Sequence, residues 1–261
     1  MNRIALQEST APGVAPHTLV DIAHRAAFDS IGLKVTHSAG ADAWWHKGAG
    51  SAELVSVVEH LLANRVSVLD VGRVELGGPT NDESYRKVLD LASRLGARYV
   101  TASPVPVAEQ VSSPTEEFAR LVRDCEDYLL VPLLLPAPAS SVPTDAQALR
   151  IVREVGGAVI VTATTDRSAF EIEAQVLEAG NQLGYVRLLA EQLDATTEEQ
   201  SAGLLATVPV HVPIAVGSAA PAERHDLETR AHRWSVLVDR MLEHPLARDR
   251  RLSLGLEGAR D

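Results

Sequence analysis

The sequence predicts an α/β protein that forms a single (β/α)8 barrel. Short β-like apolar runs alternate with amphipathic helical stretches from end to end of the chain. The length of 261 residues fits a barrel of this kind, which typically has about 250 residues. The main alternative, a doubly wound sheet, usually has a glycine-rich phosphate loop after its first strand. Here the segment 7–13 contains only Gly13, so the barrel is favoured.

Apolar runs rich in Val, Ile and Leu mark the expected strands. We expect strands at 4–7, 30–35, 66–71, 99–102, 129–135, 158–162, 185–189 and 213–216. In a barrel of parallel strands the carboxyl ends lie at one face, where the active site of such enzymes is built.

The expected helices carry apolar residues at helical spacing, as in Leu19, Ile22, Ala23 and Ala26 of the first one. Ser51 is typical of a helix N-cap, and glycines at 96 and 156–157 are typical of helix ends. We expect helices at 18–28, 51–62, 81–95, 115–128, 144–155, 168–179, 198–206 and 222–243.

No composition shift divides the chain, so residues 1–244 are expected to form one barrel domain. The remaining segment, 245–261, mixes charged residues, glycine and leucine. It is expected to be a flexible tail or a strap that docks on a neighbouring subunit of a homo-oligomer.

Composition and charge exclude several classes of protein. Apolar residues make up 46% of the chain, as in a globular protein, and the net charge of −11 disfavours nucleic acid and anionic membranes as partners. The one cysteine, Cys125, excludes an intramolecular disulfide and a multi-cysteine metal site. No export signal or membrane span is evident, so a cytoplasmic location is expected.

Three stretches are similar to a known family, the xylose isomerase-like TIM barrels. Residues 19–33 resemble its opening helix, Gly-Phe-Asp turn and strand. Residues 68–76 resemble its third strand, and 92–100 its Leu-Gly-Ala junction between a helix and a strand. The resemblance covers about residues 3–244 and implies the fold. The family contains sugar phosphate isomerases and epimerases, inosose dehydratases and type IV endonucleases, so the fold alone does not define the reaction.

The resemblance also implies a divalent metal held by carboxylates and histidines at the ends of the later strands. At those positions this chain has Leu133–Leu135, Thr162 and Thr165, Ala190 beside Glu191, and Gly217 with Ser218. Leucine and glycine cannot coordinate a hard cation. We therefore expect no metal and no other cofactor, although Asp166, Glu191 and Asp194 leave a rebuilt metal site as an alternative.

Ionisable residues near the ends of the first three strands are the candidate catalytic groups. Glu8, Asp70 and Glu75 are candidate bases, because carboxylates can accept a substrate proton. His37 is a candidate acid, since imidazole titrates near neutral pH. Arg73 is a candidate for stabilising developing negative charge. The alternatives are structural. Glu8 could be a solvated loop carboxylate or a helix cap, and His37 a hydrogen-bonded residue of the barrel rim. Asp70, Arg73 and Glu75 could form an internal set of salt bridges.

Two further sets of residues are candidates for binding the substrate. In the segment 42–50, two tryptophans lie beside a histidine and a lysine and before two glycines, which is typical of a lid over an apolar ligand or of a packed loop. Polar residues also follow the second, sixth and seventh strands. The candidates are Lys34, Trp44, Trp45, His46, Thr162, Asp166, Arg167 and Glu191.

Together these features predict a metal-independent isomerase, epimerase or lyase. It would act by general acid–base proton transfer on a small oxygenated substrate. A substrate that contains a hydrophobic ring is one candidate. The acid would be His37 or His46, and Arg73 or Lys34 would stabilise negative charge. The alternative is a catalytically inactive relative that binds a ligand or acts as an accessory protein.

Overall fold

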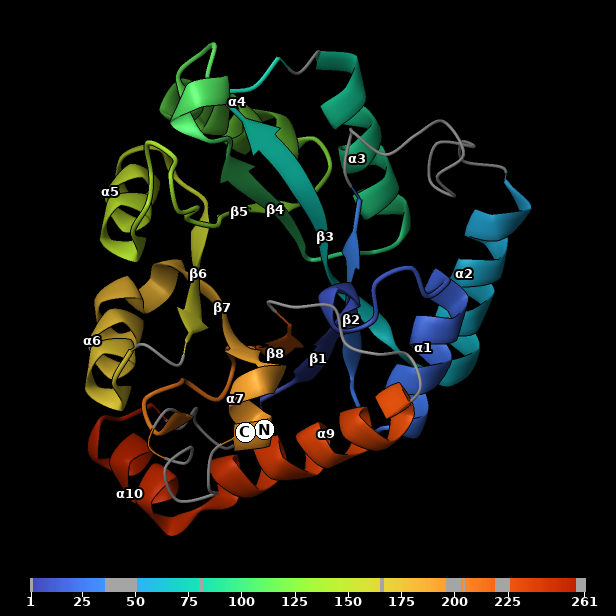
Figure 1. Ribbon diagram of the computed structural model, residues 1–261, viewed down its shortest axis with the longest axis vertical. Helices are drawn as coiled ribbons and strands as arrows, with labels where there is room; N and C mark the ends of the chain where they lie inside the picture. Colours follow the sequence, from blue (N-terminus) through green and yellow to red (C-terminus); the bar gives the residue numbers. More distant parts are fainter. Residues whose placement is uncertain are drawn as a thin grey trace. The chain divides into compact units, whose positions relative to one another are not determined.

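A computed structural model describes residues 2–35, 51–79, 82–164, 167–195, 203, 205–218 and 226–256. Its parallel strands follow one another in chain order, β1 to β8, in a closed barrel (Figure 1). The predicted (β/α)8 barrel is confirmed. The chain divides into two compact units, which we describe separately: one contains Met1–Ile31 and Val161–Asp261, and the other Gly32–Ile160.

The strands coincide with most of the expected runs. They are β1 (Ile4–Gln7), β2 (Ser30–Lys34), β3 (Ser67–Leu76), β4 (Tyr99–Pro104), β5 (Val131–Leu134), β6 (Ala158–Ala163), β7 (Leu183–Leu189) and β8 (Ile214–Gly217).

Helices alternate with the strands along the chain. The helices are α1 (Pro16–Arg25), α2 (Ala52–Asn64), α3 (Asp82–Arg94), α4 (Pro114–Glu126), α5 (Asp145–Val155), α6 (Ala169–Ala179), α7 (Ala190–Ala195), α9 (Leu227–Glu243) and α10 (Pro245–Ser253).

Local sequence explains where several helices begin and end. Ser51 Oγ accepts a hydrogen bond of 3.2 Å from the Leu54 amide, which confirms it as the N-cap of α2. Thr144 and Ser168 form capping boxes at the starts of α5 and α6. Gly96, just beyond α3, has a φ of +64°, a conformation that glycine adopts without steric cost.

In the first unit, β8 lies between β1 and β7. Ile4 pairs with Ile214, and Val186 of β7 pairs with the same residue from the other side. Helix α9 packs against α1 and β1, and it buries Trp234 and Met241 completely. Every helix within the described residues is too short or too polar to traverse a lipid bilayer.

The second unit contains β3, β4 and β5 with the helices α2 to α5. Strand β3 is longer than the expected run 66–71, because its pairing with β4 continues to Leu76 after a register shift between Gly72 and Val74. Asp70 therefore does not end the strand. It is the fourth residue of β3 and pairs with Tyr99, the first residue of β4.

The strand expected at 129–135 begins two residues later than predicted. Leu129 has a φ of +57° and is 92% exposed, because it belongs to the turn that ends α4. The Leu130 amide donates to the Cys125 carbonyl at 3.1 Å and completes this turn. The apolar side chain of Leu129 thus extended the predicted strand, although its backbone is in a left-handed turn.

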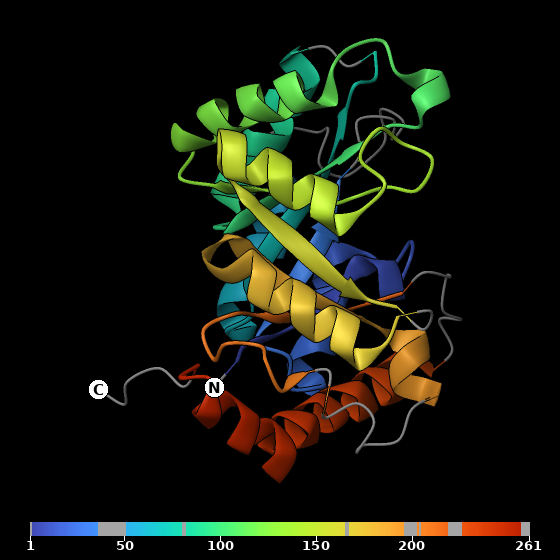
Figure 2. The same ribbon diagram turned by 90° about the vertical axis from the view of Figure 1, so that its left-hand side faces the viewer.

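Two helices did not follow from the sequence pattern. Helix α7 begins directly after β7, whereas most of the helix expected at 198–206 lies outside the described residues. Helix α10 follows α9 after a short break, with the N-terminus nearby in Figure 2. Arg251 of α10 is buried, donates from Nη1 to Asn2 Oδ1 at 3.4 Å, and donates from Nη2 to the Leu242 carbonyl.

Candidate functional site

The first unit brings polar side chains together at the carboxyl ends of β1, β7 and β8. The residues that follow these strands are Glu8 and Ser9 in a short 3-10 helix, Glu191 in the first turn of α7, and Ser218. Because carboxyl ends of parallel barrel strands form the usual active-site face, this cluster is the candidate active site of the unit. Of these residues, Glu8 and Glu191 were predicted from the sequence, and both are half-buried.

Hydrogen bonds link the loop after β8 to the ends of β1 and β7. The Ser218 hydroxyl donates to Glu191 Oε1, and the Ser218 amide donates to Ser9 Oγ at 3.1 Å. A hydroxyl donor stabilises the ionised form of a carboxylate. The hydrogen bond thus fixes one carboxylate oxygen of Glu191 against the Ser218 hydroxyl.

Arg187 is a member of this cluster that sequence reasoning missed. It lies within β7 and pairs with Ala215 of β8. A methyl group added at Gly217 would lie 3.2 Å from Arg187 Cδ and 3.2 Å from Ser9 Oγ, so the arginine stem and Ser9 lie close together over this glycine. The available signal was an arginine inside the apolar strand sequence of residues 183–189.

Asp194 fixes α7, the helix that carries Glu191. The Asp194 carboxylate accepts hydrogen bonds from Trp234 Nε1 at 3.0 Å, from Arg230 Nη2 at 2.8 Å and from Arg233 Nη2, all on α9. Burial raises the pKa of Asp194, but the hydrogen bonds from Trp234 and Arg230 and the charge of Arg233 outweigh this and lower the pKa below its ordinary value. Asp194 thus acts as an anchor between α7 and α9.

In the second unit, Asp70 and Thr101 form a buried polar pair. The Thr101 hydroxyl donates to Asp70 Oδ2 at 2.8 Å, and both residues are almost completely buried. Because Asp70 lies in the amino-terminal half of β3, this pair is not at the strand's carboxyl end, where catalytic residues of barrels usually lie.

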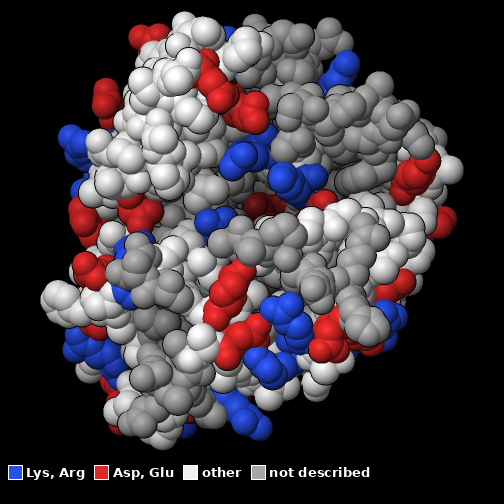
Figure 3. All heavy atoms as spheres, in the orientation of Figure 1, with Lys and Arg blue, Asp and Glu red and all other residues white. Residues whose placement is uncertain are grey.

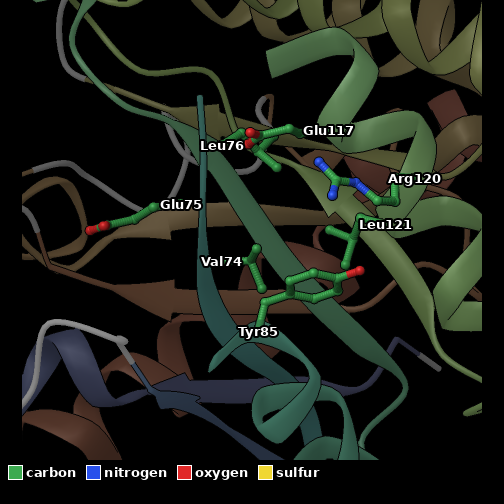
Figure 4. A pocket seen from close by; sticks show the side chains of 7 residues that line it. All are labelled: Val74, Glu75, Leu76, Tyr85, Glu117, Arg120 and Leu121. Atoms are coloured by element: carbon green, nitrogen blue, oxygen red, sulfur yellow. The ribbon is translucent and has the colours of Figure 1, made fainter. Parts of the chain in front are cut away.

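Glu75 lies near the carboxyl end of β3 and is half-buried. Figure 4 shows that it points to the opposite side of β3 from Val74 and Leu76. Arg73 falls at the register shift in β3 and is exposed, and Lys34, the last residue of β2, is also exposed. Of the two carboxylates predicted from the sequence in this unit, Asp70 and Glu75, only Glu75 lies near the carboxyl end of β3.

A pocket in the second unit lies between β3 and the helices α3 and α4 (Figure 4). Val74, Leu76 and Leu121 supply apolar walls, and Tyr85 donates its hydroxyl hydrogen to Asp124. Burial and this hydrogen bond raise the pKa of Tyr85 to about 12, so the phenol stays protonated at neutral pH. Charged side chains also line the pocket, namely Glu75 of β3 and Glu117 and Arg120 of α4.

Other predicted residues have structural contacts or lie outside the described residues. Arg167 Nη1 donates to the Thr162 carbonyl at 2.9 Å and its Nη2 donates to Gln175 Oε1, so the guanidinium bonds to both β6 and α6. Burial raises the pKa of Cys125 to about 12, which keeps this thiol protonated. The predicted residues that lie outside the described ranges are His37, Trp44, Trp45, His46 and Asp166.

The residues that the structure describes do not fit the divalent metal that the family resemblance implies. Within the described ranges, no group of three or more His, Cys, Asp or Glu residues could hold a metal ion. The fixed positive charge of Arg187 lies in the same cluster as Glu191 and would repel a divalent cation there.

Figure 3 shows basic and acidic side chains interspersed over the face it displays.

Comparisons with known proteins find similarity only among solved structures. No protein-family model matches the sequence, and no curated protein matches it. A xylose isomerase domain-containing protein from Salmonella typhimurium has 17% identity and a TM-score of 0.61, covering 93% of this chain and 96% of that one. D-allulose 3-epimerase from Methylomonas sp. has 16% identity and a TM-score of 0.71, covering 92% and 98%.

A third similar structure comes from Bacillus anthracis and is described as the probable 3-DHS dehydratase AsbF involved in petrobactin synthesis. It has 10% identity and a TM-score of 0.61, covering 91% of this chain and 99% of that one. Identities this low concern the fold alone. The comparisons confirm that the chain has the fold of xylose isomerase-like TIM barrels.

Proposed function

We propose that this chain, with its xylose isomerase-like fold, is an enzyme that moves a proton on a small oxygenated substrate by general acid–base catalysis. The reaction would be an isomerisation, an epimerisation or an elimination, and it would need no metal. An epimerase and a probable dehydratase among proteins with this fold support these reaction classes. The observation that carries the proposal is the Glu191–Ser218 pair at the ends of β7 and β8.

Glu191 is the proposed base. Its carboxylate is half-buried and hydrogen-bonded to a hydroxyl, an arrangement that orients the second carboxylate oxygen and restricts its contact with water. Proton transfer to a positioned carboxylate contributes typically about 100-fold to 10,000-fold to an enzymatic rate. The Ser218 hydroxyl orients the carboxylate. Ser9 Oγ holds Ser218 in place by accepting a hydrogen bond from the Ser218 backbone amide.

Isotope exchange in D2O tests the proposal without knowledge of the product. The purified protein is incubated with a panel of hydroxy aldehydes, hydroxy ketones and hydroxy acids, and NMR measures deuterium incorporation next to the carbonyl carbon. We expect exchange with at least one compound, and a rate about 100-fold to 10,000-fold lower in Glu191→Gln. Asp249→Asn, which alters an exposed carboxylate on α10, should keep the wild-type rate.

Matched variants separate Glu191 from the other candidate bases. Glu8→Gln, Asp70→Asn and Glu75→Gln should each retain more activity than Glu191→Gln. Loss of exchange in Glu75→Gln with retention in Glu191→Gln would transfer the role of base to β3. Ligand binding without exchange in any wild-type reaction would instead identify the inactive, ligand-binding alternative.

A further inference from the structure

Arg187 is a charged residue placed among very small ones. In the first unit, Arg187 pairs with Ala215 and Ala215 pairs with Ala5, so the three side chains point to the same face at one level of the sheet. Gly217 lies two residues further along β8, on that same face. Ala5 and Ala215 are completely buried, and Gly217 leaves space for the methylene groups of the arginine. These residues form a cradle in which the arginine stem is held.

The charge in this cradle lacks a counter-ion among the residues that the structure describes. Arg187 Nε is buried, and no described residue accepts its hydrogen. No described carboxylate forms an ion pair with the guanidinium either. Arg187 as a whole is half-buried, and Nε is the atom removed from water. A buried polar atom without a hydrogen-bond acceptor costs free energy, and buried polar groups are almost always satisfied. An anionic ligand would supply the missing acceptor.

We propose that Arg187 binds an oxyanion of the substrate, a carboxylate or a phosphate group. A guanidinium presents several hydrogens in a plane that matches both of these groups, whereas a neutral polyol does not need a fixed cation. The cradle adjoins Ser9, and Ser9 is linked through Ser218 to the proposed base Glu191. Resting on the proposed function, this inference assigns small hydroxy or oxo acids, or their phosphates, as the substrate class.

Anion binding without turnover tests the inference. Isothermal titration calorimetry measures the binding of oxalate, inorganic phosphate and the neutral polyol erythritol to the wild-type protein. We expect oxalate or phosphate to bind and erythritol not to bind, and the tighter of the two anions identifies the group. Arg187→Met should weaken that anion about 10-fold to 100-fold, whereas Arg248→Met, an exposed arginine on α10, should leave its affinity unchanged.

A second variant covers the case in which Arg187→Met does not fold. Gly217→Ala keeps the charge but presses a methyl group against Arg187 Cδ and Ser9 Oγ, so it should weaken the same anion. Failure of both anions to bind the wild-type protein, or equal affinity in the folded Arg187 and Gly217 variants, would overturn the inference.

The outcome is separable from that of the proposed function. Anion binding that depends on Arg187, in a protein without isotope exchange on the panel, would support the oxyanion site and refute the enzyme. Exchange that requires Glu191 but proceeds equally fast in Arg187→Met would support the enzyme and overturn the oxyanion site.

Discussion

Thr207 is a buried residue whose hydroxyl group does not stabilise the fold through a hydrogen bond to any described residue. The residue is fully buried, and no described residue forms a hydrogen bond with Thr207 Oγ1. Thr101 offers a contrast, since its buried hydroxyl donates to Asp70. A buried polar atom without a partner carries a desolvation cost that a satisfied one does not.

Exchanging each threonine for valine should therefore change stability in opposite directions. We expect Thr207→Val to raise the free energy of unfolding by about 1 kcal/mol, because it removes an unsatisfied group of nearly the same shape. Thr101→Val should lower it by about 1 to 3 kcal/mol, because the buried Asp70 carboxylate loses the hydrogen bond from the Thr101 hydroxyl. Urea denaturation measures both values, and a similar loss in both variants would contradict this interpretation.

At the scale of single residues, the sequence offers candidate side chains, but it does not show which of them lie close together. Glu8 and Glu191 were both predicted, but their association with Ser9, Arg187 and Ser218 depends on contacts between segments about 200 residues apart, such as Ser9 with Ser218. Arg187 was missed because an arginine inside a strand has no local pattern that marks it as a ligand.

Among the elements, α7 shows how a short helix can be held by one side chain. It has six residues, too few to be stable as an isolated helix. The hydrogen bonds of Asp194 to Trp234, Arg230 and Arg233 join it to the long helix α9. This anchor also fixes the position of Glu191, one turn earlier on α7.

Stability should depend on the ionisation of Asp194. Its pKa is lower in the folded chain than in the unfolded one, so its contribution is present above the unfolded pKa of about 4 and is lost as the pH falls through the lower folded pKa. We expect Asp194→Asn to cost about 1 kcal/mol at pH 7, and the difference from wild type to shrink below about pH 4.

Urea denaturation across pH measures this effect, and Asp90→Asn is its control. Asp90 pairs with Arg94 on the solvent-exposed side of α3, with about half of each side chain accessible, so the loss of Asp90 should cost much less than the loss of Asp194. Equal costs for the two variants, or a cost for Asp194→Asn that does not change with pH, would show that Asp194 is not an anchor.

Helix boundaries were predicted correctly where the sequence contains a local capping residue. Ser51, Ser168 and Gly96 mark ends that the structure confirms. The prediction was wrong at Leu129, where an exposed apolar residue in a left-handed turn looked like a strand residue. Tertiary context, and not local sequence, determines that turn.

On the scale of the whole molecule, the two ends of the described chain are joined through Arg251. The buried guanidinium bonds to Asn2 and to the Leu242 carbonyl, and Asn2 Nδ2 in turn donates to the Pro209 and Val212 carbonyls at 2.7 Å. Helix α10 thus connects the N-terminal segment to the end of α9 and to the loop before β8.

Removing this connection should destabilise the first unit. We expect Arg251→Met to lower the free energy of unfolding by about 2 kcal/mol, because charged hydrogen bonds to buried acceptors are lost. Differential scanning calorimetry measures the fall in melting temperature, and the exposed Arg248→Met serves as the control with little change. A melting temperature unaffected by Arg251→Met would mean that α10 does not stabilise the ends.

The barrel as a whole was predictable because each strand and helix shows its own periodic pattern and the pattern repeats. The composition added the class of protein, since a chain with 46% apolar residues and no long apolar run must fold around a core. Substrate recognition was not predictable in the same way, because the candidate lid residues Trp44, Trp45 and His46 have no partner that local sequence identifies.

The pairing of β1 with β8 has a consequence for how the chain is made. Ile4 reaches its partner Ile214 only after about 210 further residues have been synthesised. At about 5 to 20 residues per second this takes about 10 to 40 s. During that interval the ribosome-bound chain carries the apolar strand β1 without its β8 neighbour, so the barrel cannot close and this edge of β1 is exposed to aggregation until β8 has been synthesised.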